Sequence, residues 1–102
     1  MKKTELLVRH QDVSITFLNA LGLNNPVVKD VRDEVIDLTI KGGVLLRKRW
    51  TRQQASVAKG SLIVFYKQMR ELANKAKEQH GVDIVDVQAK VTDTIEYIRR
   101  TK

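Results

Sequence analysis

Hydrophobic residues recur every three or four positions along most of this 102-residue chain, and this repeat is typical of amphipathic α-helices. Thr51 and Gln54 match a capping box, so the clearest helix is predicted to begin just after Thr51 and to end near Gly81. Gly60 lies inside this segment, where it marks a kink, a close helix crossing or a true helix start at Ser61. The apolar seam of this helix is Ala55, Ala58, Leu62, Phe65, Met69, Leu72 and Ala76.

A second amphipathic helix is predicted immediately before it in the chain. Asn25 is a good N-cap, and Pro26 at the first helical position gives up no hydrogen bond. We expect this helix to end near Gly42-Gly43, with Val44–Trp50 forming either a further helical turn or a loop. Its apolar stripe is Val28, Val31, Val35 and Leu38, and the acids between them are Asp30, Asp33, Glu34 and Asp37.

The two ends of the chain carry further helical patterns. Asp83 is a suitable N-cap for a last helix, although Val85–Val91 also alternates apolar and polar residues as a strand does. Arg99 and Arg100 suit the C-terminal end of a helix, where positive charge complements the helix dipole. The first segment predicts one broken helix or two short ones ending near Gly22. The apolar residues are Leu6, Leu7, Phe17, Leu18 and Leu21 in the first segment, and Ile84, Val87, Val91, Ile95 and Ile98 in the last.

These patterns predict an all-α fold with one domain over residues 1–102, a small four-helix bundle with short connections, because no helix can bury its apolar stripe alone. The C-terminal segment is left open between helix, strand and an extended tail. The chain has no cysteine, which excludes disulfides and cysteine-ligated metal sites. No apolar run reaches the roughly 18 residues of a membrane span, and the N-terminus lacks the apolar region of a signal peptide, so we expect a cytoplasmic protein without membrane contact.

The sequence offers no arrangement of residues that is typical of an enzyme active site. His10 and His80 lie far apart, each near a predicted helix end, where we expect a surface or capping role. The acids of the second helix are spaced as a solvent-exposed face that pairs with basic residues three or four positions away. Gly42-Gly43 lacks the spacing of a phosphate-binding loop. We therefore expect no catalytic activity, no metal site and no cofactor.

Basic residues are concentrated in the middle third of the chain. Leu38–Arg70 contains eight basic residues and no acid, whereas the rest contains eleven basic and twelve acidic residues, so the net charge of +7 comes from this stretch. A localised positive field attracts polyanions, and nothing here is typical of base reading, so we predict contact with phosphate backbones or acidic partners. A solvated basic surface is the alternative. The predicted contact residues are Lys41, Arg47, Lys48, Arg49, Arg52 and Lys59, of which Arg52 and Lys59 share a helix face.

Three aromatic residues in or near this stretch have predicted roles. Trp50, the only tryptophan, is expected to pack beneath a helix start with its N–H at the surface. Stacking of Trp50 on a base of single-stranded nucleic acid is the alternative. Phe65 lies on the apolar seam and is expected in the core, whereas Tyr66 lies one position off the seam and is expected to face a neighbouring element.

Two stretches of this chain resemble a known protein family. Residues 29–43 read KDVRDEVIDLTIKGG, an acidic amphipathic helix that leads into a small-residue turn. Residues 55–72 read ASVAKGSLIVFYKQMREL, a helix in which small residues are followed by aliphatic ones. Together with the chain length and the helix order, this arrangement is similar to the head completion proteins of tailed phages, also called head–tail connector adaptors. The resemblance covers about half of the chain, and the strong basicity of this sequence departs from many of those proteins.

The resemblance implies a structural function, as a ring beneath the portal that extends the DNA channel and offers a docking surface to the tail. The implied partners are the portal protein, neighbouring copies of the chain, further head–tail joining proteins and packaged DNA. The protein would be a monomer in the host cytoplasm before it joins the virion at the head–tail junction. The portal docking residues that the resemblance implies are Tyr97, Arg99, Arg100 and Lys102.

Charge segregation adds a prediction about the contact between copies. A ring needs two different, complementary patches on each subunit. The acidic second helix and the basic stretch after it are natural complements, so we expect Asp30, Asp33 and Asp37 of one copy to meet Arg47, Arg49 or Arg52 of the next.

The sequence therefore supports two functions. The first is the adaptor ring of a phage virion, which the resemblance and the segregated charges favour. The second is a small basic DNA-binding protein that contacts the phosphate backbone without strong sequence preference, which the Arg47–Arg52 cluster favours. Binding of free DNA that weakens steeply with salt would favour the second function, because neutralised phosphates release counterions.

Overall fold

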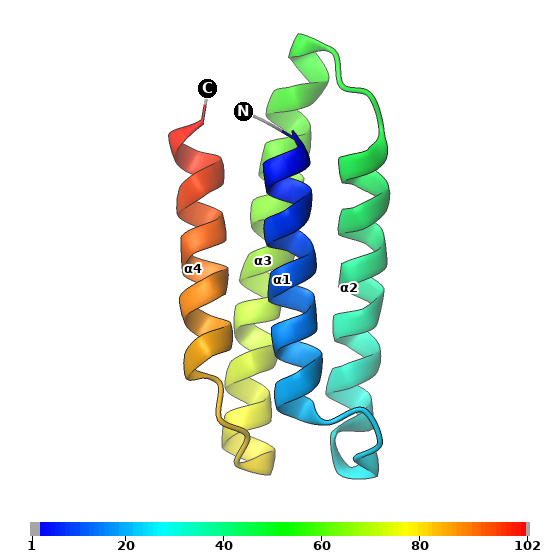
Figure 1. Ribbon diagram of the computed structural model, residues 1–102, viewed down its shortest axis with the longest axis vertical. Helices are drawn as coiled ribbons and strands as arrows, with labels where there is room; N and C mark the ends of the chain where they lie inside the picture. The colour runs from blue at the N-terminus through cyan, green and yellow to red at the C-terminus, as the bar shows by residue number, and fades with distance from the viewer. Residues whose placement is uncertain (1–2, 102) are drawn as a thin grey trace.

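The computed structural model describes residues 3–101, which form four long helices and one short 3-10 turn. Neighbouring helices run antiparallel, so the chain passes up and down the bundle in sequence order (Figure 1). The predicted all-α four-helix bundle is confirmed, and the described residues contain no strand, so the strand alternative for Val85–Val91 is wrong. The elements are α1 (Lys3–Leu21), η1 (Pro26–Val28), α2 (Lys29–Arg47), α3 (Arg52–His80) and α4 (Val85–Arg100).

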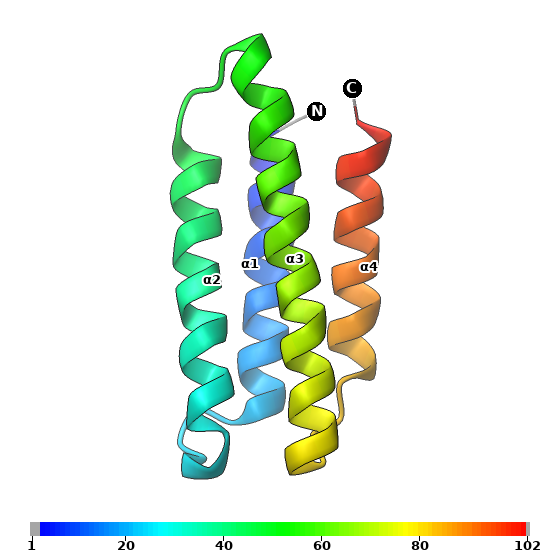
Figure 2. The ribbon, with the colours of Figure 1, turned by 180° about the vertical axis from the view of Figure 1, so that it is seen from behind.

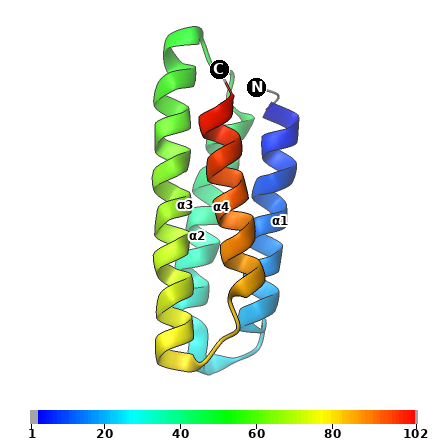
Figure 3. The same ribbon diagram turned by 90° about the vertical axis from the view of Figure 1, so that its left-hand side faces the viewer.

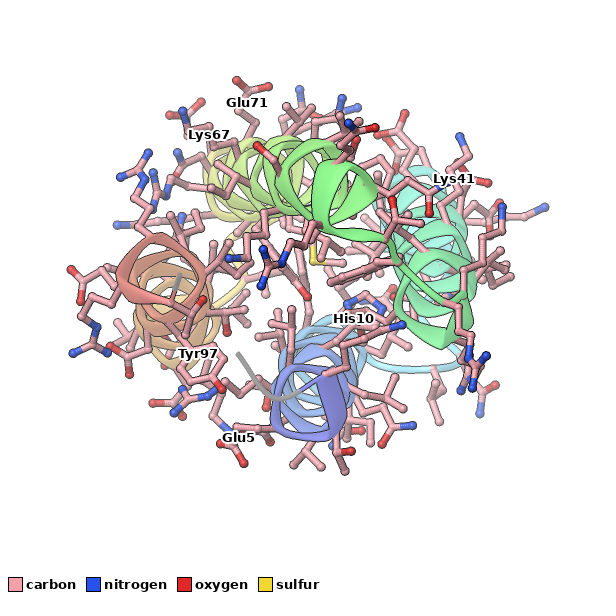
Figure 4. All side chains as sticks on the ribbon, turned by 90° about the horizontal axis from the view of Figure 1, so that it is seen from above. Glu5, His10, Lys41, Lys67, Glu71 and Tyr97 are labelled. Atoms are coloured by element: carbon pink, nitrogen blue, oxygen red, sulfur yellow. The ribbon has the colours of Figure 1, made fainter. Side chains whose placement is uncertain are left out.

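The four helices form a square around one core. α1 packs against α2 and α4, and α3 packs against the same two helices from the opposite side (Figure 4). The result is a rod of 42 × 21 × 18 Å. All five apolar residues predicted for the last helix are buried, which confirms that stripe. The largest fully buried side chains include Tyr66, Phe17, Leu6, Leu62, Met69 and Ile98.

Short-range signals place most of the helix ends as predicted. The hydroxyl of Thr51 accepts from the Gln54 backbone N–H and the Gln54 side chain accepts from the Thr51 N–H, so the predicted capping box is present. Gly81 follows α3 in the left-handed conformation with φ 67°. The Asn25 side chain caps η1, one turn before α2 begins, and the Asp83 carboxylate accepts from the Val85 N–H at the start of α4. These ends depend on residues close in sequence, which is why the sequence pattern identified them.

The terminal segments are more regular than expected. α1 is one continuous helix, not a broken one, and it ends at Leu21 before Gly22, whose φ is 84°. α4 continues to Arg100, so the C-terminal segment is helical up to that residue and no extended tail lies within residues 3–101. Lys102, predicted for portal docking, lies outside the described residues.

The expected end of the second helix at Gly42-Gly43 is wrong, because α2 continues to Arg47. Both glycines are buried within the helix. A Cβ atom on Gly42 would lie 2.4 Å from Cε1 of His10, so the missing side chain leaves room for the imidazole ring. Gly42 is therefore a packing residue, not a helix terminator. Of the segment Val44–Trp50, the part up to Arg47 is the further helical turn, and Lys48 to Trp50 belong to the loop before α3.

His10 is the centre of a buried polar network that the sequence did not reveal. It is 2% exposed, and its ring points into the bundle from the middle of α1 (Figure 4), so the expected surface or capping role is wrong. Nε2 lies 2.8 Å from the Thr39 carbonyl and Nδ1 lies 2.8 Å from the Tyr66 hydroxyl. A carbonyl only accepts, so Nε2 carries the proton and Nδ1 accepts from Tyr66. This neutral imidazole joins α1, α2 and α3 at one level.

Tyr66 of α3 faces a neighbouring element, as predicted, because it contacts His10 of α1, but Phe65 lies less deep in the core than expected. Tyr66 is fully buried, whereas Phe65 is only partly buried at the edge of the core. The phenol of Tyr66 is acceptable in the core because its hydroxyl donates to His10. Tyr66 can therefore lie in the core, although it is one position off the apolar seam, because His10 of α1 accepts a hydrogen bond from its hydroxyl.

Candidate anion-binding end of the bundle

One end of the rod gathers segments that are far apart in the sequence. The α2–α3 connection lies there together with the start of α1 and the end of α4 (Figures 1 and 3). The first turns of α3 reach beyond the neighbouring helices at this end (Figure 2). Of the described residues 3–7, 44–60 and 96–101, only Glu5 and Glu96 are acidic. We call this region the basic end, and its eight basic residues are Lys3, Arg47, Lys48, Arg49, Arg52, Lys59, Arg99 and Arg100.

A groove of about 780 Å³ opens at the basic end between α3, the start of α1 and the end of α4. Four of its lining residues are basic, and none of its lining residues within 3–101 is acidic. The remaining walls are small or apolar, with Trp50, Ile63 and Ile98 among them. We call this the basic groove, and its cations are Lys3, Arg52, Lys59 and Arg99.

The two lysines of the basic groove are held in place by backbone carbonyls. Lys59 Nζ donates to the carbonyl of Thr101 at 3.0 Å, and Lys3 Nζ donates to the carbonyl of Lys48. The Lys3 ammonium also lies 4.4 Å from the centroid of the Trp50 ring, a cation–π contact. An ammonium has three donors, so each lysine keeps N–H groups for a ligand. These contacts position the two charges without neutralising them.

Trp50 separates the basic groove from a second, more apolar one. Its indole Nε1 donates to the Leu45 carbonyl at 2.9 Å, which satisfies a carbonyl at the end of α2. The predicted packing role of Trp50 is therefore confirmed, but its N–H is bonded to the backbone and is not left at the surface. The second groove, of about 390 Å³, is lined on the far side of Trp50 by Lys48, Arg49 and the 72% exposed Val57, among others.

Gly60 lines the basic groove and lies within the regular helix α3. A Cβ at this position would meet no atom within 4 Å, so the glycine does not mark a close helix crossing, and α3 begins eight residues earlier, at Arg52. Because Gly60 has no side chain, it does not narrow the groove between Lys59 and Ile63. The N-terminus of α3 adds a positive partial charge at the same end.

The structure brings five of the six predicted contact residues to the basic end. Lys41 is the exception, because it lies two turns lower on α2, on the side of α3, where its ammonium pairs with Asp37 at 2.9 Å (Figure 4). Arg52 and Lys59 line the same groove, in agreement with their predicted common face. Sequence reasoning missed Lys3 and assigned Arg99 to another role, because only the antiparallel packing brings the chain ends beside α3.

The acids predicted for a contact between copies differ in their surroundings. Asp37 pairs with Lys41 on the same helix, and Asp30 pairs with Lys75 of α3 at 3.3 Å. A hydrogen bond from the Val31 N–H, and then Lys75, lowers the pKa of Asp30. Asp33 is exposed and has no ion pair within residues 3–101.

Tyr97, Arg99 and Arg100, which are the described residues among those predicted for portal docking, lie on α4 at the basic end. Tyr97 is half-buried and its ring stacks under the guanidinium of Arg9, 4.4 Å from the ring centroid. Arg99 lines the basic groove, and Arg100 is exposed. Tyr97 therefore has a packing role between α1 and α4, while the two arginines add to the positive end.

Residues 3–101 contain no group of three or more His, Asp or Glu side chains placed to hold a metal ion. Within the same range, no helix combines the length and the apolar character needed to cross a membrane. Comparison with protein-family models, with curated proteins and with solved structures finds no match for this chain.

Proposed function

We propose that this protein is a non-enzymatic structural protein that binds the phosphate backbone of nucleic acid through the basic end of its bundle. One observation carries the proposal: four cations from α1, α3 and α4 line a single groove without an acid among its lining residues. A folded monomer gains nothing from placing like charges together, because they repel one another. A phosphate backbone gives such a cluster its function, since each neutralised phosphate releases counterions.

The chemistry of the groove favours backbone contact over base reading. Lysine and arginine bind phosphates, whereas discrimination between bases needs side chains presented to base edges in a groove of the duplex. The first turn of α3, which reaches furthest, begins at the capping box of Thr51 and Gln54, so the Gln54 side chain is already bonded to the backbone. We therefore propose binding without strong sequence preference.

Replacing three groove cations, as in Arg52→Ala/Lys59→Ala/Arg99→Ala, is expected to weaken binding of random-sequence duplex DNA. Fluorescence anisotropy at several salt concentrations measures the effect. The wild-type affinity should fall steeply with salt, and the triple variant should lower the slope of log K against log salt by about three. A matched control, Lys29→Ala/Lys67→Ala/Lys77→Ala, removes the same charge from exposed positions away from the basic end.

Two results would refute this proposal. Equal losses for the two triple variants would mean that net charge alone attracts DNA. Absence of binding by the wild type at low salt would make the basic end a surface for an acidic protein partner.

A second candidate function is the head–tail adaptor of a tailed phage, and one observation favours it. Charge is segregated along the rod, with the basic end at one extreme, while exposed apolar residues on α1 and α2 leave a side face for contact with further copies. In that proposal, monomers form a ring only on a portal, in the virion, with Arg99 and Arg100 toward the portal. Negative-stain images with and without an added portal ring test it: ring-shaped particles should form only when the portal is present.

A further inference from the structure

Five large apolar side chains of α1 and α2 are exposed. Val8 and Ile15 of α1 are more than half exposed, as is Ile40 of α2, with Ile36 and Val44 one turn on either side of Ile40. His10 contacts Thr39 and would meet a side chain on Gly42, so the middle of α1 lies level with Ile40. Ile36, Ile40 and Val44 follow one another along α2 at helical spacing, and a row of exposed apolar residues of this kind marks an interaction surface. We call this surface the α1–α2 face.

The residues of α2 on this face follow a symmetric order. Ile36 and Val44 lie four residues before and after Ile40, whereas Asp33 and Arg47 lie seven residues before and after it. Seven residues make nearly two helical turns, so Asp33, Ile40 and Arg47 lie along one side of α2, and each charge is about 10 Å from Ile40. Along α2 the order is therefore acid, three apolar residues, base. When a second α2 lies antiparallel to the first, each acid faces a base and the apolar residues face one another.

The two charges of this pattern have no ion-pair partner among residues 3–101. Asp30 and Asp37 form ion pairs inside the chain, whereas Asp33 forms none with residues 3–101. Arg47 is exposed, and its guanidinium lies over Gly43 on the side of α1, with no carboxylate of the described residues in ion-pair distance. Both charges are therefore available to a second molecule.

We propose that two copies of this chain pair antiparallel through their α1–α2 faces, with a two-fold axis beside Ile40. Ile40 of one copy then packs on Ile40 of the other, Ile36 packs on Val44, and Asp33 meets Arg47 twice. An isologous contact of this kind requires a self-complementary surface, which the symmetric order supplies. Parallel pairing would place Arg47 on Arg47 and Asp33 on Asp33, so charge selects the antiparallel arrangement.

Pairing of this kind has a consequence for the basic end. Each rod is 42 Å long, and antiparallel pairing about its middle puts the two basic ends at opposite extremes of the dimer. If the proposed nucleic-acid contact holds, the dimer joins two nucleic-acid segments. The pairing itself does not depend on that function, because the α1–α2 face and the basic groove are built from different residues.

Sedimentation equilibrium of the full chain tests the pairing. The wild type is expected to be a dimer at micromolar concentrations, and Ile40→Glu is expected to raise the dimer dissociation constant on the order of 100-fold, because the charge is buried twice at the centre of the contact. Val64→Glu is the matched control, since Val64 is 50% exposed on α3 and Ile40 is 59% exposed on α2. Circular dichroism verifies that both variants keep their helices.

Charge exchange and cross-linking test the geometry of the pairing. Asp33→Arg should weaken the dimer, and Asp33→Arg/Arg47→Asp should restore it. Because the chain has no cysteine, Ile40→Cys should form a disulfide-linked dimer with itself under mild oxidation, whereas Ile36→Cys should cross-link only with Val44→Cys in a mixture.

Several results would overturn this inference. They are a wild type that stays monomeric up to millimolar concentration, a larger closed ring, equal effects of Ile40→Glu and Val64→Glu, or a disulfide of Ile36→Cys with itself. DNA affinity of Ile40→Glu, measured separately, keeps a failure of the pairing distinct from a failure of the proposed function.

Discussion

Gly42→Ala is expected to lower the free energy of unfolding by about 3 kcal/mol or more, because the added methyl group has no room in the core. The added Cβ would lie 2.4 Å from Cε1 and 3.0 Å from Nε2 of His10, which is much closer than atoms approach in a packed core. The imidazole would have to move, and its hydrogen bonds to Thr39 and Tyr66 would be broken inside the core. Leaving these polar groups unpaired adds to the steric cost.

Urea denaturation followed by circular dichroism measures this effect, and a second glycine supplies the control. Gly60→Ala adds the same methyl group to a helix interior where no atom lies within 4 Å, so it should stabilise the protein by about 0.5–1 kcal/mol. Opposite signs for the two substitutions would establish that Gly42 is a packing residue. A Gly42→Ala protein as stable as the wild type would show that the His10 ring does not occupy this space.

Stability is expected to fall as the pH drops below about 6.5, the value at which an unfolded histidine takes up a proton. Burial lowers the pKa of His10, and the nearby Arg47 charge lowers it further, although the hydrogen bond to Thr39 acts in the opposite direction. Below this pH the unfolded chain therefore binds a proton at His10 more readily than the folded chain does. The contribution of the neutral His10 to the free energy of unfolding is complete above pH 6.5. Below that pH it decreases by up to about 1.4 kcal/mol per pH unit, until the pH reaches the lowered pKa of His10 in the folded chain.

Urea denaturation between pH 5 and pH 8 measures this slope. His10→Gln should flatten the dependence on pH, whereas His80→Gln, which removes the other imidazole, should keep the part that belongs to His10. Nitrogen NMR of the wild type gives an answer that needs no variant, since the pKa of His10 should lie below that of an unfolded histidine, and the neutral ring should carry its proton on Nε2. An imidazole of His10 that titrates near pH 6.5 would contradict the buried network.

The same network predicts how the stability of the protein changes at alkaline pH. Burial raises the pKa of Tyr66, so this phenol stays protonated in the folded chain after an unfolded tyrosine would ionise. The contribution of Tyr66 is complete below about pH 10, and stability should decline as the pH rises above that value.

Features that depend on neighbours along the chain could be predicted from the amino-acid sequence. The capping box of Thr51 and Gln54, the left-handed Gly81 and the stripe from Ile84 to Ile98 could all be predicted, because caps and apolar spacing act within one or two helical turns. The same reasoning placed Arg52 and Lys59 on one face of α3, where both line the basic groove.

Contacts between residues of different helices could not be predicted, because they depend on how the helices pack. Gly42 looked like a helix end because its partner His10 lies 32 positions away, and the full burial of Tyr66 could not be predicted because its hydrogen-bond acceptor belongs to α1. Lys3 and Arg99 join one groove because antiparallel packing brings the start of α1 and the end of α4 beside α3. Periodicity records which side of a helix is buried, but the atom that each side chain meets is set by how the helices pack.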